Sequence, residues 1–92
     1  MTVDVKVTAT LQKLVGGARI VHGEGGTVRE VIDDLESRHP GIKEMVMVDG
    51  RIHRFVIVYL NDEDVRFLQQ LDTPIKQGDV LSILPALAGG GS

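Results

Sequence analysis

The sequence predicts a single α+β domain in which one main helix packs on one face of a mixed β-sheet. Residues 3–7 alternate valine with polar side chains, which is typical of a strand with one buried face. Residues 28–35 instead carry apolar side chains at helical spacing. Two later runs, residues 54–61 and 80–84, are apolar and rich in β-branched side chains. One helix among several strands buries its apolar stripe most simply against one face of a sheet.

The first strand, residues 3–7, predicts a β-hairpin together with the segment that follows it. Residues 15–17, Val-Gly-Gly, provide a flexible turn. Residues 18–23 then predict the second strand of the hairpin.

The helix has a start and a stop in the sequence. Thr27 is a good N-cap, and Glu30 lies at capping-box spacing, where each side chain satisfies a free backbone N–H. The apolar stripe consists of Val28, Val31, Ile32 and Leu35. Pro40 and Gly41 predict that the helix ends near His39.

The secondary structure of the middle of the chain is harder to predict. Residues 42–53 fit a helix or a strand, although Asp49-Gly50 is a turn signal. Residues 54–61 predict a central strand, on which Phe55, Ile57 and Tyr59 share one face. We expect at least two of these three side chains to pack in the core.

The remaining segments complete the sheet. Residues 61–66 predict a polar turn and then a short strand, and residues 71–79 read as irregular with a turn at Gly78-Asp79. Residues 80–84 predict the last strand, ended by Pro85.

The order of these elements predicts how they are arranged. If the first and last strands pair in the middle of the sheet, the result is the β-grasp, or ubiquitin-like, arrangement. We expect residues 1–86 to form this domain and residues 87–92 a flexible, glycine-rich tail.

Composition removes several classes of function. The net charge is −3 and no basic run occurs, which argues against nucleic-acid binding. No apolar stretch approaches the ~20 residues of a membrane span, and no signal pattern opens the chain, so we expect a cytoplasmic protein. Without cysteine there is no disulfide, thiolate metal site or thiol nucleophile.

Two stretches carry a resemblance to a known family. They are "HRFVIVYLNDEDVRF", residues 53–67, and "GDVLSILPALAGG", residues 78–90. Together they resemble the prokaryotic ubiquitin-like sulfur carriers of the ThiS/MoaD superfamily, and within it the CysO type. The resemblance spans nearly the whole chain and is strongest from His53 onward.

The resemblance implies a carrier that is not itself an enzyme. An ATP-dependent activating enzyme would adenylate the carboxylate of Gly90, and sulfur transfer would then give a thiocarboxylate. A PLP-dependent cysteine synthase would use that sulfur, and a JAMM-type zinc peptidase would release the cysteine. The activating enzyme would use ATP, and the carrier would hold no permanent cofactor.

The same tail chemistry serves other recipients, and the sequence leaves these open. They include molybdopterin, thiamine, a thiosugar, thiolated tRNA and a lysine side chain. A ubiquitin-like interaction module that is never acylated is a further alternative.

The tail residues suit entry into a narrow catalytic site. Gly89 and Gly90 lack Cβ and form a thin thread. Ala88 is small, and Leu87 offers one apolar anchor. Pro85 fixes its own φ and favours extended geometry just before the tail.

Further residues are candidates for contacts with partners. Arg54 could meet an acidic partner surface, although a solvated strand edge explains it equally well. An exposed apolar patch is expected among Phe67, Leu68 and Leu71, which the sequence does not separate from core residues.

Other polar clusters have ordinary explanations. Adjacent acids at residues 62–64 indicate a solvated turn, since nothing supplies the other ligands of a metal site. His22 and His39 lie near turns, and we expect them to be solvated. The "GEGGT" stretch before the helix lacks the lysine of a phosphate-binding loop, so its glycines serve the turn.

Two residues, Gly91 and Ser92, extend beyond the expected reactive end at Gly90. They belong to a precursor that a peptidase trims, or were added in cloning, or mark a protein no longer used as an acyl carrier. In the first two cases we expect the chain to need trimming before activation.

Overall fold

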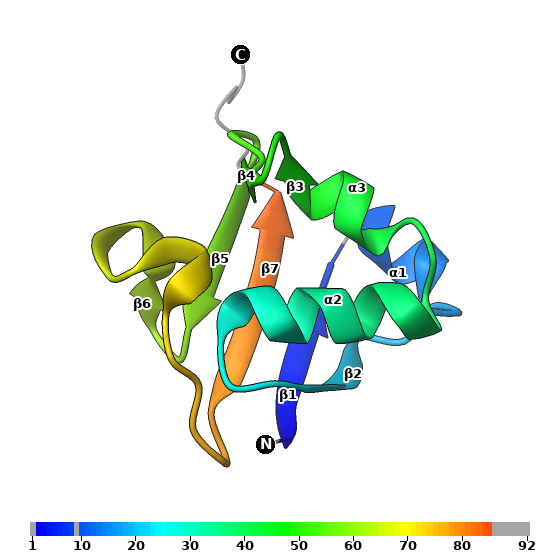
Figure 1. Cartoon of the computed structure of the whole chain (residues 1–92). Helices are drawn as coiled ribbons and strands as arrows, with labels where there is room; N and C mark the ends of the chain where they lie inside the picture. Colours follow the sequence, from blue (N-terminus) through cyan, green and yellow to red (C-terminus); the bar gives the residue numbers. More distant parts are fainter. Residues whose placement is uncertain (1, 9, 86–92) are drawn as a thin grey trace.

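The computed structural model describes residues 2–8 and 10–85, and it confirms the α+β fold with a mixed sheet and one main helix. The sheet has five strands in the spatial order β2 (Ile20–Glu24), β1 (Thr2–Val7), β7 (Val80–Pro85), β5 (Val56–Leu60) and β6 (Glu63–Asp64). The first and last strands pair in parallel at its centre, with Val5 opposite Leu81. The other pairs are antiparallel, so the predicted β-grasp arrangement is confirmed (Figure 1).

Helix α2 (Val28–Arg38) crosses one face of this sheet (Figure 1). Thr27 caps it as predicted, because its Oγ1 accepts a hydrogen bond from the Glu30 amide at 3.2 Å. The Glu30 carboxylate accepts from the Gly26 amide at 2.7 Å, one residue earlier than in a standard capping box. His39 is the C-cap, and Gly41 has a left-handed φ of 106°, which confirms the predicted end of the helix.

Short elements fill the connections, and none of the described helices is long and apolar enough to cross a membrane. They are α1 (Thr10–Leu14), α3 (Ile42–Val46), the hairpin β3 (Met47–Val48) and β4 (Arg51–Ile52), and the 3₁₀ turns η1 (Val65–Phe67) and η2 (Gln70–Asp72). The ambiguous segment 42–53 is therefore a helical turn followed by a hairpin. Its turn at Asp49-Gly50 is confirmed, with φ values of 52° and 76°.

The predicted pairing of β1 with β2 and the turn at residues 15–17 are confirmed, but the connection also contains α1, which was not predicted. Leu11 and Val15 are each 7% exposed, and their spacing of four residues places both on the side of the turn that faces the core. The Gln12 side chain donates to the carbonyl of Val7 at 3.1 Å, which helps to hold the turn against the end of β1. The second strand consequently begins at Ile20 rather than at residue 18.

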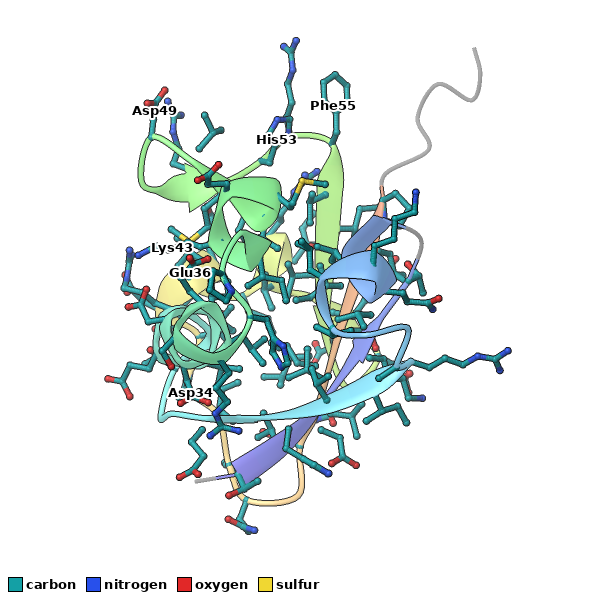
Figure 2. The ribbon with its side chains drawn as sticks, turned by 90° about the vertical axis from the view of Figure 1, so that its right-hand side faces the viewer. Asp34, Glu36, Lys43, Asp49, His53 and Phe55 are labelled. Carbon is teal, nitrogen blue, oxygen red and sulfur yellow. The ribbon has the colours of Figure 1, made fainter. Side chains whose placement is uncertain are left out.

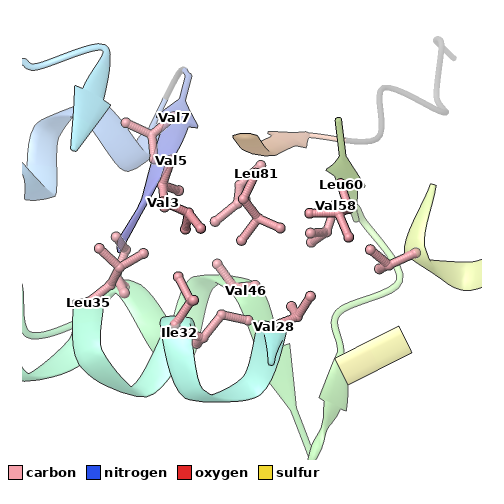
Figure 3. Packing of buried hydrophobic residues seen from close by; sticks show 14 of the residues in the cluster. Val3, Val5, Val7, Val28, Ile32, Leu35, Val46, Val58, Leu60 and Leu81 are labelled. Atoms are coloured by element: carbon pink, nitrogen blue, oxygen red, sulfur yellow. The ribbon is translucent and has the colours of Figure 1, made fainter. Parts of the chain in front are cut away.

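The core lies between the sheet and α2 (Figure 3). The predicted stripe of α2 is confirmed, since all four of its residues are fully buried: Val28, Val31, Ile32 and Leu35. The face predicted for β5 is wrong. Val58 and Leu60 enter the core, whereas Ile57 and Tyr59 are half-buried on the opposite face and Phe55 is 53% exposed. The run from 55 to 60 is apolar on both faces, so period two alone does not fix its phase.

Strand β2 forms one edge of the sheet, and side chains of α2 cover part of it. The Asp34 carboxylate accepts a hydrogen bond from the Glu24 amide at 3.0 Å, and the Arg38 guanidinium donates to the carbonyl of His22 at 3.2 Å. Asp34 and Arg38 also form an ion pair at 3.1 Å. These contacts occupy backbone groups that would otherwise be open to another strand.

Replacing both Asp34 and Arg38 by alanine is expected to increase self-association through β2. The substitutions free the Glu24 amide and the His22 carbonyl for pairing with a second chain. Sedimentation velocity over a concentration series measures the effect. Asp33→Ala is the matched control, since Asp33 pairs with Lys43 on the surface. A double variant that sediments like the control at every concentration would contradict this role for the pair.

Candidate functional site

The predicted tail begins where β7 ends. Pro85 is exposed and is the last residue of β7, where it lies opposite Val56 of β5. The other predicted tail residues lie outside the described residues: Leu87, Ala88, Gly89 and Gly90. The structure therefore describes the platform that precedes these residues, which is the end of β7 at Pro85.

That platform is held firmly. Strand β7 is paired along one side with β1 and along the other with β5. Leu81 and Ile83 anchor it in the core, and both are fully buried. Helices α1 and α3 and the β3–β4 hairpin gather around the end of the sheet where β7 finishes (Figure 1). The end of β7 is thus fixed by the same packing that stabilises the fold.

A mainly apolar hollow of about 260 Å³ lies beside this point, and we call it the tail-base hollow. Its apolar lining comes from the two strand ends and from helices α1 and α3, and consists of Leu11, Met45, Phe55, Val56, Ile83, Leu84 and Pro85. Thr8, Glu44 and His53 contribute polar atoms to its lining. Because Met45 is 40% exposed and Phe55 53%, the hollow presents apolar surface that no described residue covers.

Met45 reaches the hollow because α3 is held against α2. The Glu36 carboxylate of α2 accepts hydrogen bonds from the amide of Lys43 at 2.8 Å and from that of Gly41 at 3.2 Å. Lys43 in turn bonds to Asp33 at 2.7 Å. Figure 2 shows Glu36 and Lys43 where the two helices meet. The bonded amides belong to the start of α3, where a carboxylate also interacts favourably with unpaired N–H groups.

Arg54 lies in a small cluster with His53 and Phe55 at the start of β5. The Arg54 guanidinium carbon is 5.0 Å from the centroid of the Phe55 ring, which is within cation–π range. The imidazole of His53 lies 5.4 Å from the same ring and accepts a hydrogen bond from the Phe55 amide. Figure 2 shows His53 and Phe55 together at this end of the molecule. The cluster therefore places the positive charge of Arg54 next to Phe55, which lines the hollow.

Arg66, which the sequence did not single out, holds this cluster in place. Its guanidinium donates to the carbonyl of Val56 at 2.9 Å and to that of Arg54 at 3.3 Å. The Arg66 amide is itself capped by the carboxylate of Asp64 at 2.9 Å. Nothing in the sequence around Arg66 indicated this role. Only the fold shows that its guanidinium reaches the carbonyls of Arg54 and Val56.

The three residues of the predicted apolar patch are not all exposed in the structure. Phe67 is 87% exposed and Leu68 37%, whereas Leu71 is 4% exposed and belongs to the core. Phe67 stands on η1 and is not among the residues that line the tail-base hollow. The structure therefore brings Arg54 and Pro85 to the same end of the sheet, and Phe67 does not line the hollow there.

Sequence reasoning also missed Thr8, Leu11 and Met45 as lining of the hollow. Leu11 and Met45 lie in short helical turns that are too brief to give a periodic signal. Within the described ranges, no three His, Asp or Glu side chains gather into a metal-ligand cluster. The arrangement can present a chain end and a docking surface to another protein.

Comparison with known proteins is consistent with this description. The model of the ThiS family matches residues 5–90. The sulfur carrier protein CysO of Mycobacterium tuberculosis is 46% identical, over 98% of this chain and all of its own. A chain of the Amycolatopsis orientalis BexX/CysO complex has a TM-score of 0.90 at 50% identity, covering 96% of this chain and 99% of its own. Small archaeal modifier protein 3 of Haloferax volcanii is 29% identical over 98% of this chain and all of its own.

Proposed function

The chain belongs to the ThiS family, and from that premise we propose that it is a sulfur carrier whose end at Gly90 becomes a thiocarboxylate for cysteine synthesis. One observation carries the proposal: the chain is 46% identical to a CysO sulfur carrier across its length. The position of Pro85 supports it, because the described chain ends there on a central strand that is paired on both sides.

The proposed activation has two steps. An oxygen of the Gly90 carboxylate attacks the α-phosphorus of ATP, forming an acyl adenylate and releasing pyrophosphate. Sulfur delivered at the oxidation level of sulfide then attacks the acyl carbon, the C–O bond breaks and AMP leaves. The product is a thiocarboxylate. The activating enzyme supplies the catalytic groups, and the carrier holds no permanent cofactor.

Glycine at residues 89 and 90 suits these steps. A backbone without side chains enters a narrow site beside ATP and adopts whatever dihedral angles that site requires. Ordering a tail residue costs about 1–2 kcal/mol. We propose that contacts at Arg54, Phe67 and the apolar rim near Pro85 offset this loss when the partner docks. Leu87 and Ala88 would line the approach.

In the proposed delivery, the thiocarboxylate sulfur attacks an activated serine derivative in a PLP-dependent cysteine synthase. The carbon–sulfur bond forms as the leaving group departs from that derivative. Attack of the amine on the thioester then shifts the acyl group from sulfur to nitrogen, which leaves cysteine amide-linked to the carrier. A JAMM-type zinc peptidase hydrolyses this amide and regenerates the carboxylate. The carrier is a substrate throughout, and we place it in the cytoplasm, where ATP is available.

The test uses the chain ending at Gly90, with the activating enzyme, ATP, sulfide, the cysteine synthase and its serine-derived substrate. Intact mass spectrometry is expected to show sulfur on the carrier, followed by a carrier with one cysteine residue added. A chain ending at Ala88 is the matched control and is expected to show neither product. Failure of the chain ending at Gly90 to take up sulfur would overturn the carrier function. Sulfur uptake without the cysteine adduct would overturn the recipient.

A second candidate is protein modification, which the similarity to small archaeal modifier protein 3 favours. In that case a lysine amine attacks the acyl adenylate, and an isopeptide bond forms as AMP leaves. Peptide mapping of proteins joined to the chain ending at Gly90 in its native cell would distinguish the two. Lysine-linked remnants of the tail indicate modification, whereas a terminal cysteine adduct indicates sulfur delivery.

A further inference from the structure

Three arginine side chains at one end of the sheet form no ion pair with another described residue. Within residues 2–8 and 10–85, no carboxylate oxygen lies within 4.0 Å of a guanidinium nitrogen of Arg51, Arg54 or Arg66. Both arginines of α2, by contrast, are paired with carboxylates. Since the chain carries a net charge of −3, these positive charges are a local exception to its overall charge.

The fold brings the three arginines together. Arg51 and Arg54 line a hollow of about 420 Å³ between the β3–β4 hairpin and the start of β5, which we call the hairpin hollow. The Arg66 guanidinium lies beside it, because it donates to the Arg54 carbonyl at 3.3 Å. Two carboxylates are near: Asp49 lines the hollow, and Asp64 caps the Arg66 amide. Positive charge therefore remains in excess at this surface.

Exposed apolar side chains lie among these charges. Val48 is 47% exposed and Phe55 53%, and both line the hairpin hollow. Val48 is opposite Arg51 in the register of the hairpin, and the Arg54 guanidinium carbon is 5.0 Å from the Phe55 ring. Figure 2 shows Phe55 at the same end of the molecule as Asp49. Each exposed apolar side chain thus has a guanidinium group next to it, and arginine and aromatic side chains are enriched where proteins bind one another.

The backbone beneath this surface is held in place. The His53 amide donates to the carbonyl of Val46 at 2.7 Å, which joins the hairpin to α3. Ile52 packs against the core, and Arg66 holds the carbonyls at the start of β5. A partner that docks here would therefore have little backbone to order, which lowers the cost of binding.

We propose that the hairpin hollow is a docking site for an acidic segment of a partner protein, in which carboxylates flank one large apolar side chain. The apolar side chain enters the hollow against Val48 and Phe55. The carboxylates on either side of it pair with Arg51 and Arg54, and Arg66 adds to the attraction. An apolar cavity of ~150 Å³ is large enough for benzene, so the 420 Å³ of the open hollow has room for such a side chain.

Other classes of ligand fit this surface less well. A free anion would pair with the arginines but would leave Val48 and Phe55 exposed to water. A nucleic acid is bound through several phosphate contacts, which the net charge of −3 opposes. An acidic segment with an apolar side chain covers both kinds of group at once.

Fluorescence anisotropy on the intact 92-residue chain tests the docking. The probe is a labelled peptide with one leucine flanked on each side by aspartates. We expect it to bind saturably, and to bind more weakly as salt rises from about 0.15 M to about 1 M, because the Debye length falls from about 8 to about 3 Å. Peptides with asparagine in place of the aspartates, or serine in place of the leucine, are expected to bind about tenfold more weakly.

The double variant Arg51→Gln with Arg54→Gln is expected to bind the aspartate peptide about tenfold more weakly, since each exposed ion pair contributes up to about fivefold. Arg19→Gln with Lys76→Gln is the matched control. It removes the same charge from exposed side chains that do not line the hollow and form no ion pair within the described ranges. Nuclear magnetic resonance is expected to show the largest amide shifts on binding within residues 48–55.

Several outcomes would overturn the proposal. They are the absence of saturable binding, equal affinity for the aspartate and asparagine peptides, equal loss in the two double variants, and shifts that lie mainly outside the hairpin hollow. A single-stranded DNA oligomer that binds more tightly than the aspartate peptide would assign the arginines to phosphates instead, which also overturns it. Because the measurement needs no activating enzyme, its failure leaves the sulfur-carrier function standing, and failure of sulfur uptake leaves the docking intact.

Discussion

The 92-residue chain is expected to remain unmodified when it is mixed with its activating enzyme, ATP and sulfide, whereas a chain ending at Gly90 is expected to gain sulfur. The α-carboxylate of the longer chain belongs to Ser92, two residues beyond the proposed reactive carbon. If the proposed function holds, we expect the serine side chain and the added length to keep that carboxylate out of a site that accepts a terminal Gly-Gly. The match to the ThiS family model also ends at Gly90.

Intact mass spectrometry of the two chains, incubated side by side, measures this difference. The chain ending at Gly90 should show exchange of one oxygen for one sulfur, and the 92-residue chain should keep its mass. A chain ending at Gly91 is a useful intermediate, because it lacks the serine side chain but keeps one extra residue. Prompt sulfur uptake by the 92-residue chain would contradict the assignment of Gly90 as the reactive end.

Gly25→Ala is expected to destabilise the domain strongly. A Cβ at this position would lie 2.6 Å from the Cβ of Glu30 and 2.8 Å from the backbone nitrogen of Val31. Both atoms belong to the first turn of α2, whose residue Val31 is fully buried and cannot retreat without disturbing the core. We expect a loss of about 3 kcal/mol from the free energy of unfolding, near the upper end for an overpacked site. For a domain of this size that lowers Tm by roughly 12–24 °C.

Gly26→Ala is the matched control for this effect. At Gly26 the nearest atom to an added Cβ is a carboxylate oxygen of Glu30 at 3.5 Å, an ordinary contact with the end of a flexible side chain. We expect its free energy of unfolding to stay within about 1 kcal/mol of the unmodified chain. Urea denaturation of both variants gives the comparison. Equal stability of the two variants would show that the approach of Gly25 to α2 is not tight.

The main helix and the first strand could be predicted because their signals are local and repeated. Thr27 and the apolar stripe define α2 from within eleven residues, and the structure keeps both its start and its end. The alternating valines of β1 fixed the buried face of that strand, because polar residues mark its other face. Residues 10–14 carry too short a signal for a helix to be predicted, and α1 was found only in the structure.

The candidate site was only partly accessible to such reasoning. Pro85 and Arg54 were identified from residue type and resemblance, and the fold places them at one end of the sheet. The hollow beside them needs Thr8, Leu11 and Met45, which lie just after β1, in α1 and in α3. Their proximity depends on how α1 and α3 pack, and no local pattern carries that information.

The sequence alone determined the fold class, the main helix and the place of the glycine-rich end after the last strand. Each of these depends on spacing within a short window, which backbone geometry converts directly into structure. Only the tertiary structure decided which face of β5 is buried, that Leu71 is core while Phe67 is exposed, and that Arg66 holds the carbonyls of residues 54 and 56. These outcomes depend on contacts between segments far apart in the chain, where an apolar residue is equally suited to the core and to a docking surface.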